Sequence, residues 1–161
     1  MTLFMKPLLH ALNQFFEIKN RKLTPGERQL AQSVFGTHLQ LDAISIVAHR
    51  GVMKNYAISP NGNIYFHPQS WSEDFSKLSL AKQSWLIHEL THVWQIQQGL
   101  AVVRKALFDR KYRYVLEQGK LFLQYGIEQQ AQMVQDYFIK KSRGQECQAY
   151  EDCIPFLSQK A

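Results

Sequence analysis

Residues 80–99 read LAKQSWLIHELTHVWQIQQG, and this stretch decides the fold. Its apolar residues lie on nearly every side of an α-helix, which is typical of a helix buried in the middle of a domain. We therefore predict a central helix from about Leu80 to Gln98, ended by Gly99. The apolar residues of this pattern are Trp85, Leu86, Ile87, Leu90, Val93, Trp94 and Ile96.

The same stretch carries two histidines four residues apart, His88 and His92, with Glu89 directly after the first. Residues at this spacing share one helix face, about 6 Å apart along the axis, so both imidazoles can reach one metal ion. Glu89 is rotated by about 100° around the helix. Its carboxylate then borders the metal site, where it can take a proton from a water molecule that zinc activates. The spacing predicts Zn²⁺ as the cofactor, His88 and His92 as ligands, and Glu89 as general base.

Chance is the competing explanation for this motif. The composition gives about 0.01 expected random matches in a chain of this length. Two histidines and a glutamate would also be costly to bury in an apolar helix unless something satisfied them. The metal-site interpretation is therefore favoured.

A third protein ligand would leave one coordination position open for water. Glu128 is the leading candidate, because it begins a second strong helix, predicted from Ile127 to about Lys141, beside that helix's apolar face. The competing interpretation is a solvated glutamate favoured by the helix dipole. The other candidates are Glu117, Asp136 and Glu146, with His67 as a third histidine.

Peptide hydrolysis also requires a donor for the developing oxyanion, besides zinc. Tyrosines on helices are more often packing residues, and spacing does not choose one of them. The candidates are Tyr112, Tyr114, Tyr125, Tyr137 and His67.

The rest of the chain predicts one more clear helix and a small amount of sheet. Thr24, Pro25 and Glu27 form the N-cap, first turn and capping box of a helix, and Gly36 is placed to end it. The remaining predicted elements are a strand at Leu41–His49, a hairpin of Tyr56–Ser59 and Ile64–Phe66 around an Asn-Gly turn, and a helix with an irregular connection within residues 100–126.

Length and composition fit a single domain covering residues 1–161. The chain is 45% hydrophobic and 20% charged, which suffices to bury a core without disulfides. Its net charge of +6 favours anionic surroundings. The basic residues are scattered, however, and the densest runs, at 19–22 and 110–113, indicate solvated faces, so we expect no nucleic-acid partner. Cys147 and Cys153 could close a disulfide loop, bind a metal or do neither.

The N-terminus does not have the pattern of a signal peptide, because Lys6, His10 and Asn13 interrupt its apolar stretch. No segment reaches the roughly 18 to 20 apolar residues of a membrane span. We expect a protein that is cytoplasmic as synthesised, without stable membrane insertion, and exported, if at all, without a signal peptide. Leu8, Leu12, Phe15 and Phe16 recur at helix spacing, which predicts a first helix that packs in the core. The less favoured alternative is that this helix face docks on a membrane.

The run from His88 to His92 resembles the zinc motif of thermolysin-like metallopeptidases, in which one helix supplies two histidines and a later helix a glutamate. The resemblance implies a zincin-like fold with Glu128 as ligand and an edge strand lining the cleft, a role for the hairpin around Ile64–Phe66. In those enzymes an aspartate four residues after the glutamate orients a histidine. Here that position is Gln132, which implies a weaker bond to the imidazole.

Over more of the chain, about residues 23 to 140, the sequence resembles a family of small bacterial zincin-like proteins. Members of that family are often associated with type VI secretion spike and polymorphic-toxin genes. The resemblance implies a link to secretion or interbacterial competition. It rests on Leu23–Glu27 with Ser33–Gly36, on Ile87–Gln95 and on Ile127–Ala131.

These patterns predict an α+β, zincin-like fold, mostly helical with a small antiparallel sheet or hairpin beside the zinc helix. The predicted function is that of a zinc metalloendopeptidase acting on a peptide, a protein or a peptidoglycan peptide, as a secretion-associated effector or a cell-wall hydrolase. Its predicted protein partner is a secretion-system component or an immunity protein. The alternative is a catalytically weak zinc-binding adaptor of a bacterial secretion system, whose fourth zinc ligand is a side chain such as His67 or a cysteine.

Overall fold

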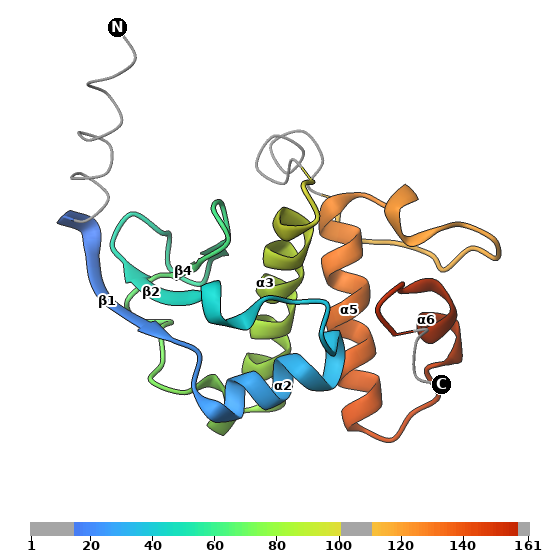
Figure 1. The fold of residues 1–161 in the computed structure, drawn as a ribbon, viewed down its shortest axis with the longest axis horizontal. Helices are drawn as coiled ribbons and strands as arrows, with labels where there is room; N and C mark the ends of the chain where they lie inside the picture. The colour runs from blue at the N-terminus through green and yellow to red at the C-terminus, as the bar shows by residue number, and fades with distance from the viewer. Residues whose placement is uncertain (1–14, 101–110, 158–161) are drawn as a thin grey trace, which may run out of the picture.

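The computed structural model describes residues 15–100 and 111–157. The predicted first helix lies outside these residues at Leu8 and Leu12, whereas its Phe15 and Phe16 are described and are exposed, so they do not pack in the core as predicted. Much of the helix predicted within residues 100–126 also lies outside the described residues. The described chain combines four α-helices with one four-stranded sheet, which confirms the predicted α+β class. In Figure 1 the sheet lies on one side of the central helix α3 and helix α5 lies on the other.

Helix α3 spans Leu80–Gln97 and is the buried centre of the fold, as predicted. Every residue from Leu86 to Gln95 is buried. Gly99 follows with a φ of 77°, a left-handed conformation that glycine adopts at little cost. Helix α5, Ile127–Ser142, runs beside α3 in the opposite direction (Figure 1).

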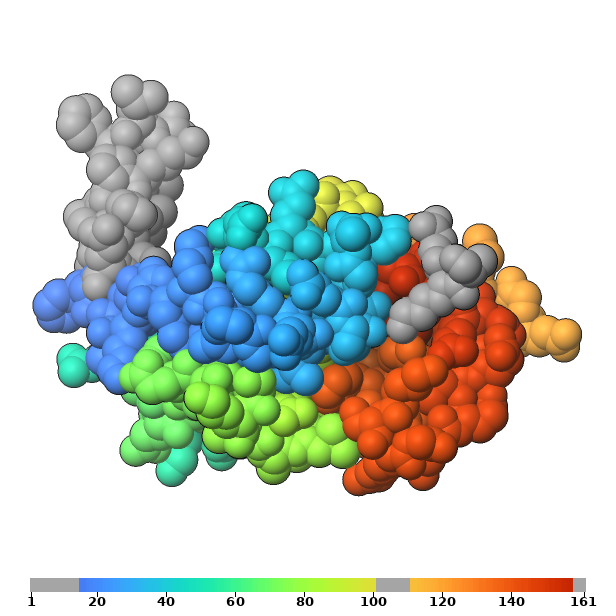
Figure 2. Space-filling view, turned by 60° about the horizontal axis from the view of Figure 1, so that its bottom comes forward, coloured from blue at the N-terminus to red at the C-terminus, as the bar shows by residue number. Residues whose placement is uncertain are grey.

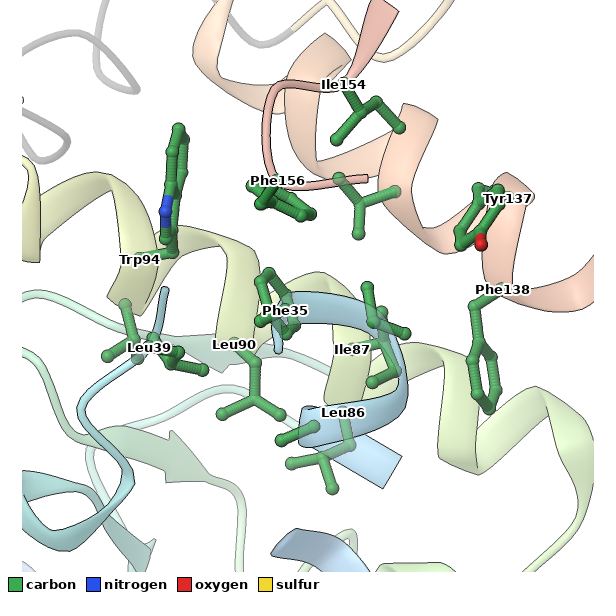
Figure 3. Packing of buried hydrophobic residues seen from close by; sticks show 14 of the residues in the cluster. Phe35, Leu39, Leu86, Ile87, Leu90, Trp94, Tyr137, Phe138, Ile154 and Phe156 are labelled. Atoms are coloured by element: carbon green, nitrogen blue, oxygen red, sulfur yellow. The ribbon is translucent and has the colours of Figure 1, made fainter. Parts of the chain in front are cut away.

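The C-terminal segment completes the hydrophobic core. Helix α6, Gln148–Cys153, was not predicted, and the chain after it places Phe156 beside Phe35 and Trp94, with ring centroids 4.9 and 5.0 Å apart (Figure 3). Cys147 and Cys153 lie at the two ends of α6 and are free thiols. The disulfide alternative therefore does not hold in this structure.

Helix α2, Pro25–Phe35, begins and ends as its sequence predicts. Glu27 N donates to Thr24 Oγ1 at 3.2 Å, and Thr24 N donates to Glu27 Oε2 at 2.9 Å, so both bonds of the capping box are present. Gly36 ends the helix with a φ of 55°. In Figure 2, β1 and α2 (blue) lie across one face of the molecule.

The sheet has the strand order β1-β2-β4-β3 and is mixed. Strand β2 pairs in parallel with β4, and the other two pairs are antiparallel. The predicted antiparallel sheet is therefore only partly correct, because β4 returns between β2 and β3 instead of extending the sheet at its edge. The strands are β1 Glu17–Lys22, β2 Ser45–His49, β3 Ala57–Ile58 and β4 Ile64–Phe66.

Three details of the sheet correct the sequence prediction. The basic run at residues 19–22 belongs to edge strand β1, where lysine suits an exposed edge. The strand predicted from Leu41 begins only at Ser45, because Leu41–Ala43 form a 3₁₀ turn. The hairpin is present, but its edge strand is Ala57–Ile58 and not Ile64–Phe66.

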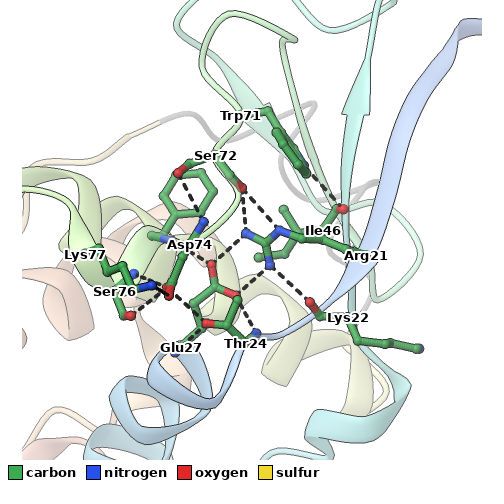
Figure 4. Close-up of polar contacts among 11 residues, drawn as sticks. Arg21, Lys22, Thr24, Glu27, Ile46, Trp71, Ser72, Asp74, Ser76 and Lys77 are labelled. Atoms are coloured by element: carbon green, nitrogen blue, oxygen red, sulfur yellow. Dashed lines mark hydrogen bonds and ion pairs between the residues drawn. The ribbon is translucent and has the colours of Figure 1, made fainter.

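A buried ion pair connects the sheet to the segment before α3 (Figure 4). Arg21 of β1 donates from Nη1 and Nη2 to the two oxygens of Glu27, at 2.7 and 2.8 Å. Glu27 also accepts from Phe75 N at 2.8 Å, and Arg21 donates to the Ser72 carbonyl oxygen at 2.6 Å. The carboxylate of Glu27 is completely buried, so this network holds β1, α2 and the approach to α3 together.

None of the helices in the described ranges is long and apolar enough to cross a membrane.

We predict that Arg21→Ala destabilises the protein by about 3–5 kcal/mol, because the substitution leaves a buried carboxylate without its cation. Lys19→Ala is the matched control, since Lys19 on the same strand pairs with Glu73 in the open, at 2.6 Å, and such pairs contribute about 1 kcal/mol or less. Urea unfolding of both variants measures the difference. Equal destabilisation by the two substitutions would contradict the role given to the buried pair.

Candidate metal centre

Three buried side chains meet where α3 and α5 lie side by side. His88 and His92 come from α3, and Glu128 comes from the first turn of α5. The Nε2 atoms of His88 and His92 lie 3.4 and 3.3 Å from Glu128 Oε2. One possible ligand atom from each residue lies within 4.8 Å of the others, and within the described ranges no further His, Cys, Asp or Glu joins this group.

The ring of His92 is fixed by a glutamine one turn further along α3. His92 Nδ1 lies 2.8 Å from Gln95 Oε1. Gln95 Nε2 donates to the Ile127 carbonyl oxygen at 3.0 Å, which can only accept, so the amide orientation is set by its partners. His92 Nδ1 therefore carries a hydrogen, and in the neutral ring the lone pair of Nε2 is directed at Glu128.

The ring of His88 is oriented in the same way from the other helix. His88 Nδ1 lies 3.0 Å from Oε1 of Gln135 on α5. Gln135 Nε2 donates to Ser84 Oγ at 3.3 Å, and the Ser84 hydroxyl itself donates to the Ala81 carbonyl oxygen at 3.0 Å. Gln135 thus accepts from His88, and the Nε2 lone pair of His88 also faces Glu128.

When both rings are neutral, the two imidazole Nε2 atoms and the carboxylate oxygen form a set of acceptors with no hydrogen between them. Such a set, buried and convergent, is satisfied by a cation. Two histidines and a glutamate are also the donor atoms of a class of catalytic zinc sites. The residues therefore fit a zinc ion, and His88, His92 and Glu128 are those that would hold it.

The local electrostatics favour positive charge at this point. Burial acts to raise the pKa of Glu128, but without a metal ion protonated His88 and His92 donate to it from Nε2, and these bonds and charges hold the pKa at about 2. Burial acts to lower the pKa of His92, but the bond to Glu128 and the charge of Glu89 outweigh it, so the pKa is raised. Both directions follow from the contact between the imidazoles and the carboxylate, which keeps Glu128 ionised and favours positive charge beside it.

Glu89 follows His88 on α3 and is also buried, with 4% of its surface exposed. Its Oε2 accepts a hydrogen bond from Ser59 Oγ at 3.0 Å. Ser59 directly follows edge strand β3 and is itself 6% exposed. Sequence reasoning placed Ser59 in the hairpin but gave it no role at the site.

The other candidates for the third ligand have partners elsewhere. His67 Nδ1 accepts from Gln69 N, Glu117 pairs with Lys120, Asp136 accepts from Tyr114 and Gln132, and Glu146 accepts from Gln148 N. None of them belongs to the group formed by His88, His92 and Glu128. The structure thus brings together the leading candidates and separates the alternatives.

Among the oxyanion candidates, Tyr112 is the one beside the site. Its ring centroid lies 6.2 Å from that of His88, and 47% of its surface is exposed. The remaining candidate hydroxyls have other partners: Tyr114 bonds to Asp136 and Tyr150, Tyr125 to Val115 and Glu117, and Tyr137 to Glu151.

The role suggested for Gln132 is wrong, because Gln132 Nε2 donates to Asp136 Oδ1 at 2.8 Å and not to an imidazole. Gln95 and Gln135 perform that role. Gln95 lies three residues after His92, on the same helix face. Gln135 lies two turns after Glu128, again on one face, so both could have been found by helix spacing.

Comparison with known proteins gives two related matches, while no family model matches the chain. The chain is 38% identical over 143 residues to the type VI secretion system spike protein VgrG2b of Pseudomonas aeruginosa, a match covering 80% of this chain but 14% of that protein. It also resembles the solved effector domain of P. aeruginosa VgrG2b, with a TM-score of 0.72 and 36% identity, over 82% of this chain and 80% of that one. The predicted similarity to type VI secretion proteins is confirmed, whereas zinc binding and peptide hydrolysis stay predictions.

We predict about one zinc ion per purified wild-type chain and loss of that zinc in His92→Ala and Glu128→Ala, because three protein ligands are needed for tight binding. His67→Ala is the control, since His67 lies outside the group. Elemental analysis after dialysis measures the content. If Glu128→Ala kept its zinc and His67→Ala lost it, the assignment of Glu128 as the third ligand would be wrong.

We further predict that Gln95→Ala weakens zinc binding about 10- to 100-fold, the effect of removing a hydrogen-bond partner of a ligating histidine. Gln97→Ala is the control, because Gln97 on the same helix bonds to the backbone of Gln40 at the surface. Competition with a chromogenic chelator gives both affinities. Equal affinities for the two variants would show that Gln95 does not orient the ligand.

Proposed function

Because the chain belongs to the family of the VgrG2b effector domain, we propose that it is a secretion-associated effector that hydrolyses peptide bonds with a bound zinc ion. The single observation that carries the proposal is the convergence of buried His88, His92 and Glu128 with Glu89 directly beside them on α3. The chain spans 14% of the length of VgrG2b, so the activity and partners of a whole spike protein do not transfer with the domain.

The proposed reaction assigns each site residue a separate task. Bound zinc would polarise the scissile carbonyl and lower the pKa of a water molecule. Glu89 takes a proton from the attacking water, whose oxygen forms a bond to the carbonyl carbon. As the carbon–nitrogen bond breaks, Glu89 returns the proton to the leaving amine.

Hydrogen bonds from the two histidines to glutamines keep the imidazole rings in a fixed orientation. Gln95 and Gln135 each accept from an imidazole Nδ1, at 2.8 and 3.0 Å, so the rings need no reorientation during turnover. Pre-set geometry of this kind lowers the cost of reaching the transition state.

The substrate class proposed is a peptide, a protein or a peptidoglycan peptide. The net charge of +6 suits an anionic polymer such as the cell wall. The proposed partners are a secretion-system component, in keeping with the similarity to a type VI secretion spike protein, and an immunity protein. The adaptor alternative has less support, because within the described ranges neither His67 nor a cysteine joins the group as a fourth ligand.

Glu89→Gln tests the proposal. The amide cannot accept the proton, so we expect hydrolysis of a mixed quenched-fluorescent peptide library to fall at least about 100-fold, as for loss of a general base. Zinc content should stay at the wild-type level, because Glu89 is not a ligand. Undiminished hydrolysis by the variant would exclude Glu89 as the base, and inactivity of the wild type would favour the adaptor.

A further inference from the structure

We propose that Ser59 is a positioning residue for Glu89: its hydroxyl holds one carboxylate oxygen, so that the other is the one presented for proton transfer. This inference rests on the proposed function, in which Glu89 is the general base. It adds a third structural element, the β3–β4 hairpin, to the two helices that form the metal centre.

The contact between the two residues is direct and buried. Ser59 Oγ donates to Glu89 Oε2 at 3.0 Å, and the two residues are 6% and 4% exposed. A buried carboxylate needs such a donor, because it has lost its hydration. Ser59 supplies such a donor to this carboxylate.

A glutamate needs this constraint because its last torsion angle is intrinsically broad. Helix α3 fixes the Glu89 backbone, but it does not by itself fix the rotation of the carboxylate. A hydrogen bond at Oε2 fixes it from outside the helix. It also assigns the oxygens different tasks, since the oxygen that already accepts from Ser59 is occupied and, within the part of the chain that the structure describes, its partner is not.

The hairpin presents the Ser59 hydroxyl to α3 through strand alternation. Ala57 and Ile58 pair with Phe66 and Tyr65 of β4. Ala57 packs against the main core, whereas Ile58 is 49% exposed. Ser59, two residues after Ala57, points to the same side as Ala57 and hence towards α3.

A purely structural role for Ser59 is the competing explanation, because the hydroxyl also satisfies a buried charge. The two roles predict different measurements. A structural hydroxyl affects thermal stability and leaves turnover unchanged. A positioning hydroxyl lowers kcat while zinc content and KM change little, and a threonine, which keeps the hydroxyl, restores turnover.

The experiment uses the full chain loaded with zinc and the same peptide library as the probe. We compare Ser59→Ala and Ser59→Thr, with Ser33→Ala as the control, because Ser33 bonds to a carbonyl within α2, away from the site. We expect kcat to fall about 10- to 100-fold in Ser59→Ala, part of the contribution of a well-placed base. Ser59→Thr and Ser33→Ala should stay within about threefold of wild type, with KM and zinc content unchanged in all three.

A double-mutant cycle tests the contact without substrate. The fall in thermal midpoint for Ser59→Ala with Glu89→Ala together should be smaller than the sum of the two single falls, because both changes remove one bond. Additive falls would overturn the contact and with it the proposal, even if the threonine variant did not fold. A non-additive cycle with unchanged kcat in Ser59→Ala would overturn the positioning role but leave the proposed function standing. Absence of hydrolysis by the wild type would instead overturn the proposed function, and the positioning role with it.

Discussion

The packing of α3 against α5 is the constraint on which the rest of the site depends. It places a carboxylate from the start of one helix against two imidazoles in the middle of the other, with oxygen-to-nitrogen distances of 3.3 and 3.4 Å. Three acceptors buried at this distance are unfavourable without a cation between them. The helix pair therefore has to be held by contacts other than the site itself, and the apolar stripe of α5 and the aromatic cluster around Phe156 supply them.

Glutamine amides are the partners of both imidazoles, and this choice affects the charge of the site. A carboxylate in that position would raise the basicity of the ring and add a second negative charge. Gln95 and Gln135 orient the rings but stay neutral. Glu128 is thus the one anionic member of the three-residue group, and a divalent ion bound there would keep a net positive charge, which suits stabilisation of an oxyanion.

How much of the structure could be predicted from the sequence depended on how local each signal was. The spacing of His88 and His92, the capping box at Thr24 and the stripe of α5 are set within one or two helix turns, and the structure has them as predicted. The strand at Glu17–Lys22 was missed because its charges suit an exposed edge as well as a solvated loop. The parallel pairing of β2 with β4 and the contact of Ser59 with Glu89 depend on segments that meet only in the folded chain. Gln132 was suggested by the resemblance to thermolysin-like enzymes, and helix spacing from Glu128 admits both Gln132 and Gln135. Only the packing of α5 against α3 shows that Gln135 is the one that reaches His88.

The polar contacts before α3 and those along α3 have different roles. The ion pair of Arg21 with Glu27 lies at the beginning of α2 and reaches Phe75 N, so it fixes where the chain enters α3. The glutamines and Ser59 act further along that helix, on the side chains that carry the proposed chemistry. If the entry to α3 shifted along the helix axis, His88 and His92 would move together, whereas Glu128, anchored on α5, would not. The buried ion pair, although remote from the metal centre, therefore contributes to the register between the two helices that the three-residue group requires.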